Sequence, residues 1–201
     1  MAESVPLAPE LCGLVLAGGR SERFGPDKAA VLIHGQTLLA RAVAALRGVV
    51  SEVRVAVRQD QLAESLRRRF MLVPDVAEGI GPAAGILAAH RLCPDTAWLV
   101  VACDMPGVTQ ELLAMLIEHR DPARPATAFR AATDGLPEPL CAIYEPATLA
   151  RFRRQVEAGG NPSPRSWLAA EHPVLLDAPT ANALNSINTP GDLARLRSPQ
   201  R

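Results

Sequence analysis

Two nearly continuous apolar runs along the chain predict buried strands. Residues Leu11–Leu16 and Trp98–Ala102 carry almost no polar side chain, as is typical of strands buried on both faces of a parallel sheet. Between them, Glu52–Val57 alternates polar and apolar positions, and Phe70–Val73 is a shorter, mainly apolar run. The pattern therefore predicts four strands in the first half of the chain.

Segments with helical spacing lie between and after these strands. Thr37 can cap a helix, and apolar residues follow it at helical intervals: Leu38, Leu39, Ala42, Val43 and Leu46. Three more helices are predicted at Gln61–Arg69, at Ala83–Leu92 and from the cap Thr109 to about Glu118. Short strand–helix alternation favours parallel strands joined by right-handed crossovers. We therefore expect an α/β fold: a doubly wound, mostly parallel central sheet with helices on both faces.

The remainder of the chain is less regular. A strand is predicted at Leu140–Tyr144, a helix from Pro146 to about Ala158, and a loop over Gly159–Pro164. The pattern Thr189-Pro190-Gly191-Asp192 opens a last helix with proline at its first position. The tail after Arg197 is expected to fray. No stretch is long enough to be a linker, so a single domain is expected.

Composition excludes several classes of protein. The 201 residues include 21 basic and 21 acidic side chains, so the formal net charge is zero, and only 3% are aromatic. A nucleic-acid-binding protein would need a basic surface and often stacking aromatics. No apolar run has the length of a membrane span, and the first ten residues hold two acids and no base, unlike a secretory signal. We expect neither nucleic acid nor membrane as a partner.

The cysteines point to a reducing compartment. Cys12, Cys93, Cys103 and Cys141 form no Cys-x-x-Cys pair, and three of them lie in apolar runs. Buried, reduced thiols are the simplest interpretation. The sequence therefore predicts a cytoplasmic location.

A glycine-rich loop with three basic residues follows the first buried strand: LAGGRSERFGPDK, residues 16–28. Glycine lets main-chain N–H groups approach an anion, while Arg20, Arg23 and Lys28 add positive charge. Neither a Walker A pattern nor Gly-x-Gly-x-x-Gly is present. The combination of glycines, cations and buried strand favours a phosphate-binding loop over a structural turn with solvated arginines.

Three other polar residues stand near predicted strand ends. Asp104 directly follows the strand Trp98–Ala102, apart from Cys103. A carboxylate there can hold Mg²⁺, which prefers oxygen and bridges to phosphates, or it can simply cap a turn. Asp75 ends the strand Phe70–Val73, and Asn188 lies in NALNSINTPGD, where an amide can serve a metal or a phosphate. Ligands of open α/β sheets bind at the carboxyl ends of strands, so these residues are site candidates.

The loop at 16–28 resembles the L-A-G-G-x-S-x-R-x-G-x-D-K signature of the molybdenum cofactor guanylyltransferases (MobA-like), and every fixed position matches. The resemblance extends over about residues 11–196, including the family's C-D-x-P at Cys103–Pro106 and P-L-x-A-x-Y at Pro139–Tyr144. It implies a Rossmann-like nucleotidyltransferase fold in one domain, residues 1–201. A nucleotide-binding part would span about 11–120 and an acceptor-side part about 121–197.

The resemblance also implies roles for individual residues. Arg23, Lys28 and Asp104 would be catalytic, with Asp104 holding Mg²⁺ as the only cofactor. Asn188 and Arg165 would face the acceptor. The residues expected to bind the nucleotide are Leu16, Ala17, Gly18, Gly19, Lys28, Asp75, Gly81, Pro82 and Asp104.

The chain departs from the family pattern at two places. Family members often carry A-N-R after the second strand, with the Asn contacting the base, whereas this chain has Ala56-Val57-Arg58. Near the C-terminus the family's earlier Asn falls on Ser186, with Asn185 one position off. Gly18, by contrast, favours a guanine nucleotide, because related branches that use CTP more often have alanine there.

The leading hypothesis is transfer of GMP from GTP to the terminal phosphate of (Mo-)molybdopterin, with release of pyrophosphate. That acceptor is already anionic, so catalysis needs positioning and charge neutralisation rather than a Ser, Cys or His nucleophile. Proteins that deliver molybdopterin or mature molybdoenzymes are expected partners. The alternatives are another nucleotide or acceptor (CTP with molybdopterin, or an NTP with a sugar phosphate) and a non-catalytic nucleotide-binding module.

Overall fold

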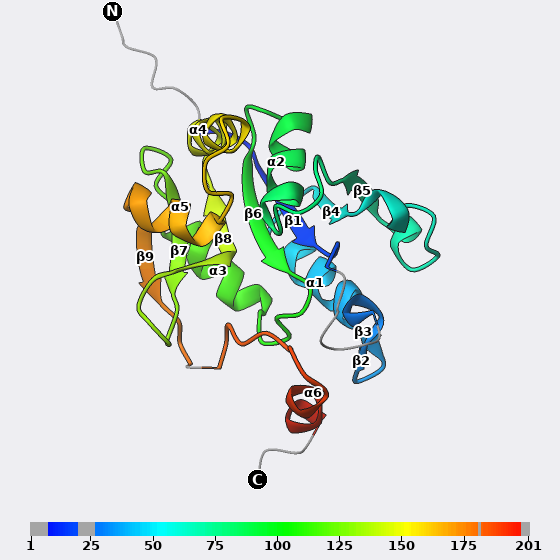
Figure 1. Ribbon diagram of the computed structural model, residues 1–201. Coiled ribbons are helices and arrows are strands. Elements are labelled where there is room, and N and C mark those ends of the chain that lie inside the picture. Colours follow the sequence, from blue (N-terminus) through cyan, green and yellow to red (C-terminus); the bar gives the residue numbers. More distant parts are fainter. Residues whose placement is uncertain (1–7, 20–26, 181, 198–201) are drawn as a thin grey trace, which may run out of the picture.

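The computed structural model describes residues 8–19, 27–180 and 182–197 (Figure 1). Nine strands are described: β1 Leu11–Leu16, β2 Leu32–Ile33, β3 Gln36–Thr37, β4 Val53–Val57, β5 Met71–Pro74, β6 Ala97–Ala102, β7 Ala126–Arg130, β8 Pro137–Tyr144 and β9 Val174–Asp177. The α-helices are α1 Leu38–Arg47, α2 Ala83–Leu92, α3 Gln110–Glu118, α4 Pro146–Glu157, α5 Pro164–Glu171 and α6 Pro190–Arg197. Three short 3₁₀ turns complete them: η1 Lys28–Ala30, η2 Gln59–Gln61 and η3 Arg67–Arg69.

Seven strands form one sheet in the order β5-β4-β1-β6-β8-β7-β9. Strand β1 pairs in parallel with β4 on one side and with β6 on the other. Strand β8 is antiparallel to both β6 and β7, whereas β7 and β9 are parallel. One strand of seven thus runs against the rest, which confirms the expected mostly parallel sheet.

Helices cover both faces of this sheet. On one face α1 packs against α3, and on the other α2 packs against α4. Successive residues of β1 serve opposite faces: Val15 packs with α1 and α3, while Leu14 packs with α2 and α4, and both are fully buried. The doubly wound architecture is therefore confirmed, and it explains why the central strands read as continuous apolar runs.

The C-terminal segment returns to the first half of the chain. After β9 it runs past the lower edge of the sheet in Figure 1 and ends in α6. Ile187 is almost fully buried against Ile33 of the β2–β3 hairpin and Leu38 of α1. A short, isolated hairpin has little stability of its own, so this apolar cluster fixes hairpin and C-terminal segment together.

The predicted helix at Gln61–Arg69 is wrong: only the turns η2 and η3 occur there. Tertiary contacts compete with the helical pattern. The Gln61 side chain accepts a hydrogen bond from the backbone N–H of Arg58, and the Arg67 side chain turns inward to the carbonyl of Ala17. Buried side-chain hydrogen bonds of this kind outweigh a modest helix propensity.

The second half contains elements that the hydrophobic pattern did not predict. Strands β7 and β9 are only five and four residues long, too short for a clear alternation. Helix α5 follows the predicted loop at once. It begins with Ser163 as its cap and Pro164 at its first turn, a signal that was present in the sequence. The predicted tail after Arg197 lies outside the described residues.

No helix in the described ranges is long and apolar enough to cross a bilayer.

Candidate active site

A cleft of about 1120 Å³ opens at the carboxyl ends of β1, β4, β5 and β6. The connection after β1 leads to β4 on one side, while that after β6 leads toward β7 on the other, so the chain changes direction between these strands. Ligands of open α/β sheets bind at such a switch point. The cleft brings together all nine residues expected to bind the nucleotide, together with Asn188.

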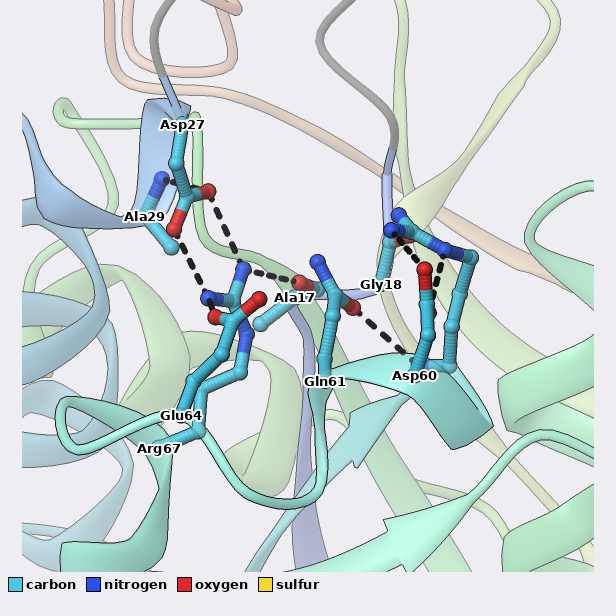
Figure 2. A network of polar contacts seen from close by, with 9 residues as sticks. Ala17, Gly18, Asp27, Ala29, Asp60, Gln61, Glu64 and Arg67 are labelled. Carbon is cyan, nitrogen blue, oxygen red and sulfur yellow. Dashed lines mark hydrogen bonds and ion pairs between the residues drawn. The ribbon is translucent and has the colours of Figure 1, made fainter.

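Gly18 lies at a close contact between the cleft-lining segments after β1, β4 and β5. A Cβ added to Gly18 would lie 3.0 Å from Oδ2 of Asp75 and 3.3 Å from the backbone N of Arg58. Arg58 Nη1 donates a 2.6 Å hydrogen bond to the carbonyl of Gly18, and its Nε and Nη2 pair with Asp60 (Figure 2). Arg58 keeps the Arg of the family's A-N-R pattern, and the departure from that pattern is Val57, which stands where the family has Asn.

Asp75 supplies a partly buried carboxylate to the wall of the cleft that contacts Gly18. Burial raises its pKa from 3.8 to about 6, and the nearby positive charge of Arg58 opposes this rise only in part. Gly85 of α2 adds to the burial, because a Cβ there would lie 3.3 Å from Oδ1 of Asp75. Asp75 is therefore a poorly solvated acceptor for the N–H donors of a ligand.

The Gly-Pro turn before α2 lines the same cleft. Gly81 has a φ of +60°, the left-handed conformation that side-chain-bearing residues rarely adopt, and Pro82 follows it at the start of the helix. Gly81 and Pro82, both predicted from the sequence to bind the nucleotide, thus line the same cleft as Gly18.

Lys28 lies between two oxygen groups at the floor of the cleft. Its Nζ is 3.0 Å from Oδ2 of Asp104 and 3.0 Å from Oδ1 of Asn188. The three residues come from the start of η1, from the end of β6 and from the C-terminal segment. Lys28 is also the single lysine of the chain, beside twenty arginines. A compact ammonium differs from a planar guanidinium in reach and geometry, so lysine at this one position is chemically specific.

Main-chain contacts fix Asp104 and Asn188 relative to each other. The backbone N–H of Ile187 donates a 2.8 Å hydrogen bond to the carbonyl of Asp104. Asp192 then accepts hydrogen bonds from the backbone N–H groups of Asn188 and Thr189, which confirms the capping pattern at the start of α6. These bonds hold Asn188 beside the end of β6 although 84 positions separate it from Asp104.

The donor set fits a divalent cation that is shared with a substrate. The carboxylate of Asp104 and the amide oxygen of Asn188 both point to the position that the Lys28 ammonium occupies. Mg²⁺ prefers oxygen ligands and is commonly held by one or two carboxylates together with substrate phosphates. Among the described residues no group of three or more His, Cys, Asp or Glu side chains could hold a metal alone. Asp104 and Asn188 would thus bind the cation jointly with a nucleotide.

Cys103, next to Asp104, is buried and unsuited to nucleophilic chemistry. Burial, and to a smaller extent the neighbouring charge of Asp104, raise its pKa to about 12. A thiol with such a pKa stays protonated near neutral pH. The sequence interpretation of Cys103 as a packing residue agrees with this environment.

Arg67 lies behind the cleft, bonded to two of its lining residues, and the sequence did not predict it. Its side chain is fully buried, and both terminal nitrogens contact the carboxylate of Asp27, at 2.7 and 3.0 Å (Figure 2). Nη2 also donates to the carbonyl of Ala17 at 2.9 Å, and Nη1 pairs with Glu64. Burial lowers the pKa of Arg67, but the bonds and charges of Asp27 and Glu64 outweigh it and raise the pKa above its ordinary value.

Arg165 lies apart from the main cleft. It lines an adjoining hollow of about 390 Å³ that shares Gly79, Pro82 and Leu140 with the cleft. Arg165 Nη2 contacts both carboxylate oxygens of Asp134, at 2.7 and 2.9 Å. Arg165 therefore stands at the far end of a continuous depression, already paired with a carboxylate.

The remaining predicted residues are placed as follows. Arg23 lies outside the described residues. Asn185 donates to the side chain of Asn182 rather than lining the cleft. The C-terminal amide in the site is thus Asn188.

Comparison with known proteins relates the chain to one group of enzymes. Residues 13–179 match the family model described as the MobA-like NTP transferase domain. The molybdenum cofactor guanylyltransferase of Burkholderia vietnamiensis is 30% identical over 200 residues, covering 94% of this chain and 97% of that protein. The molybdenum cofactor biosynthesis bifunctional protein of Synechocystis is 32% identical over 149 residues, so that this chain corresponds to less than half, 43%, of that longer protein.

A solved structure has a similar fold. The molybdopterin-guanine dinucleotide biosynthesis protein A of Archaeoglobus fulgidus superposes with a TM-score of 0.72 at 26% identity, covering 92% of this chain and 96% of that one.

Proposed function

Because the chain belongs to the MobA-like NTP transferase family, we propose that it transfers GMP from GTP to the terminal phosphate of (Mo-)molybdopterin and releases pyrophosphate. The observation that carries this proposal is the Lys28–Asp104–Asn188 cluster beside Gly18 and Gly19 in the switch-point cleft. A cation, a carboxylate, an amide and exposed main-chain groups are what phosphoryl-type transfer requires. The names of similar proteins agree with this choice of substrates.

The proposed reaction is an in-line displacement at the α-phosphorus of the nucleotide. An acceptor phosphate oxygen forms a new P–O bond, the bond from the α-phosphorus to the bridging oxygen breaks, and its electron pair leaves with pyrophosphate. No proton has to be removed from the nucleophile, because a phosphate monoester is ionised near neutral pH. The protein then contributes position and charge, which the glycine loop and Lys28 can supply.

Bound Mg²⁺ would neutralise charge on the nucleotide phosphates. Asp104 and Asn188 are the residues proposed to hold it, since their oxygens converge. Lys28 contributes a second positive charge from the chain itself, and Arg23 is proposed to add a third.

Base selection is where this chain departs from its family. Asp75 is proposed to offer a carboxylate to the two adjacent N–H donors of guanine. At the end of β4 the family's Arg is kept as Arg58, which is bonded to Gly18, but the family's Asn is replaced by Val57. The replacement of the amide by Val57 favours, as the second candidate, a transferase that accepts another nucleotide such as CTP.

Calorimetric titration with GTP, CTP, ATP and UTP, each with and without Mg²⁺, tests the proposal. We expect GTP to bind most tightly and Mg²⁺ to strengthen its binding. Pyrophosphate release with GTP and molybdopterin then tests the acceptor. A preference for CTP, or equal binding of all four, would overturn the guanylyl assignment in favour of the second candidate. Binding without any pyrophosphate release would indicate a non-catalytic module.

We also propose a cytoplasmic enzyme whose protein partners deliver molybdopterin or mature molybdoenzymes. All four cysteines are free thiols, which is the common state in a reducing compartment.

A further inference from the structure

The network around Arg67 suggests a role beyond folding. Three separate segments meet at this guanidinium: Ala17 after β1, Asp27 before η1, and Glu64 within its own β4–β5 connection (Figure 2). Two of the three are direct sequence neighbours of proposed site residues, since Gly18 follows Ala17 and Lys28 follows Asp27. We propose that Arg67 is a positioning residue that holds the Ala17–Gly19 segment and Lys28 in register for nucleotide binding, and this inference rests on the proposed function.

The contacts are of the kind that fix geometry. Arg67 meets Asp27 with two parallel N–H···O bonds, which orient both planar groups as well as pairing their charges. The same Asp27 carboxylate accepts from the backbone N–H of Ala29 at 3.1 Å and caps η1. Rotation of either group therefore moves the first turn of η1, and with it the backbone of Lys28.

The second contact acts on the other side of the cleft. Arg67 Nη2 donates to the carbonyl of Ala17, while the Ala17 N–H donates to the carbonyl of Ala56 in β4. The main-chain N–H and the main-chain carbonyl of Ala17, directly before Gly18, are thereby both fixed. Among the residues that line the cleft, Arg67 hydrogen-bonds to Ala17 and Asp27, and through them it determines where Gly18 and the Lys28 ammonium lie relative to each other.

Retention of such a group has a cost. A fully buried guanidinium loses its hydration, and replacement of a buried ion pair by apolar residues is often neutral or stabilising. The Arg67–Asp27 pair is therefore expected to add little to the free energy of unfolding, but it fixes the relative orientation of the two side chains.

The chain supplies a matched control at the opposite end of the sheet. Arg120 pairs with both oxygens of Glu145, at 2.7 and 2.9 Å, and donates to the carbonyl of Pro9 at 3.0 Å. Like Arg67, it therefore bonds one carboxylate through two nitrogens and also one main-chain oxygen, although Arg67 pairs in addition with Glu64. The Arg120–Glu145 pair is not part of the cleft.

The test compares Arg67→Lys with Arg120→Lys, because lysine keeps the charge but cannot make the fork of bonds. We expect R67K to lower kcat/KM for nucleotide by about 10²-fold, as a displacement of order 1 Å of reacting groups can do. R120K should leave kcat and KM within about twofold. Because R67K could fold poorly, Asp27→Asn is the second variant. It changes the more exposed partner of the pair and should cause the same loss of kcat/KM.

Hydrogen exchange gives a readout that needs no substrate. We expect the amides of Ala29, Ala30 and Val31 to exchange at least about tenfold faster in R67K and D27N than in the wild type, but not in R120K. Equal exchange and equal kinetics in folded R67K would overturn the proposal. Loss of kcat/KM in R67K and R120K in proportion to their lowered melting temperatures would also overturn it. If the wild type releases no pyrophosphate, the proposed function fails, while the exchange experiment still decides the role of Arg67.

Discussion

At the scale of single residues, Lys28 is the centre of the site. It is the only lysine in the chain, and its ammonium lies 3.0 Å from both the Asp104 carboxylate and the Asn188 amide oxygen. An amine at this point can exchange its protein partners for phosphate oxygens when a nucleotide enters, since each partner bond is replaced by a bond of similar kind. Three predictions follow from the residues on and beside this point.

Removal of the Lys28 charge should mainly affect turnover. We expect Lys28→Ala to lower kcat by about 10²-fold, comparable to the loss of one donor to a transition state. Lys28→Arg should not restore the rate, because a planar guanidinium cannot occupy the position of a compact ammonium. Steady-state pyrophosphate release checks both variants. An unchanged kcat/KM in K28A would remove Lys28 from the mechanism.

Asp104→Ala should abolish turnover and leave the fold intact. The side chain is partly exposed, and the carbonyl of Asp104 would still accept its bond from Ile187. Circular dichroism and pyrophosphate release measure the two effects separately. Asp177→Ala, at an exposed ion pair with Arg130, is the control that should keep full activity. Near-normal turnover in folded D104A would contradict a metal-binding role.

Asp75 should make stability depend on pH. Burial raises its pKa to about 6 from 3.8, so the folded protein binds more protons than the unfolded chain between these values. The contribution of Asp75 to the free energy of unfolding is therefore highest at low pH. It falls as the pH rises from about 3.8 to 6, and it stays constant at higher pH. We expect Asp75→Asn to gain stability relative to wild type across this interval, measured by denaturant unfolding at several pH values. If the difference in unfolding free energy between wild type and D75N did not change with pH, the raised pKa of a buried Asp75 carboxyl would be contradicted.

At the scale of elements, close packing of α2 on the central strands shapes the cleft. Gly85 of α2 permits this approach, because a Cβ there would lie 2.6 Å from Cβ of Ala56 and 2.9 Å from Cδ2 of Leu16. The helix can then bring the Gly81-Pro82 turn over the end of β5. The distance between α2 and the sheet is thus part of the nucleotide site.

This packing predicts opposite outcomes for two helical glycines. Gly85→Ala should cost about 1–3 kcal/mol of unfolding free energy, as overpacking in a core does, and should weaken nucleotide binding. Gly191→Ala in α6 should be neutral or stabilising by up to about 1 kcal/mol, since the added Cβ would lie 3.6 Å from Thr189 Oγ1, an ordinary van der Waals contact. Denaturant unfolding measures both. A stabilising G85A would show that α2 can move away from the sheet without cost.

At the scale of the whole molecule, the C-terminal segment links the two halves of the chain. Ile187 joins the cluster of Ile33 and Leu38, and Asn188 reaches Lys28. Apolar clusters on both faces of the sheet share residues from the first and second halves, such as Val15 with Phe129 and Leu14 with Tyr144. A nucleotide-binding part and an acceptor-side part would therefore not fold independently.

We accordingly predict a single unfolding transition for residues 1–201. Far-ultraviolet circular dichroism and tryptophan fluorescence should give coincident midpoints, and the calorimetric and van't Hoff enthalpies should agree. Two resolved transitions would divide the chain into separate domains. Ligand that binds the native state should move the one transition to higher temperature as a whole.

The amino-acid sequence by itself determined the central architecture and most of the candidate site. Strands buried on both faces leave long apolar runs, and a glycine loop and Asp104 follow two such strands while Asp75 follows the shorter apolar run of β5, so local pattern was sufficient. The short strands β7 and β9 and the turns η2 and η3 could not be predicted in the same way. Their conformation depends on partners far away in the chain, whose contribution exceeds local propensity.

Only the tertiary structure decided which distant groups meet. Nothing near Arg67 in the sequence distinguishes it from Arg68 and Arg69, yet it alone is fully buried and bonded to Asp27 and Ala17. Asn188 rather than Asn185 enters the site because Ile187 is fixed by the carbonyl of Asp104 and by an apolar cluster. Charged and polar contacts between segments carry no periodic signal along the chain, whereas burial of a strand or helix face does. The hydrophobic pattern therefore predicts the strands and helices of the fold, whereas the polar contacts between distant segments are known only from the folded structure.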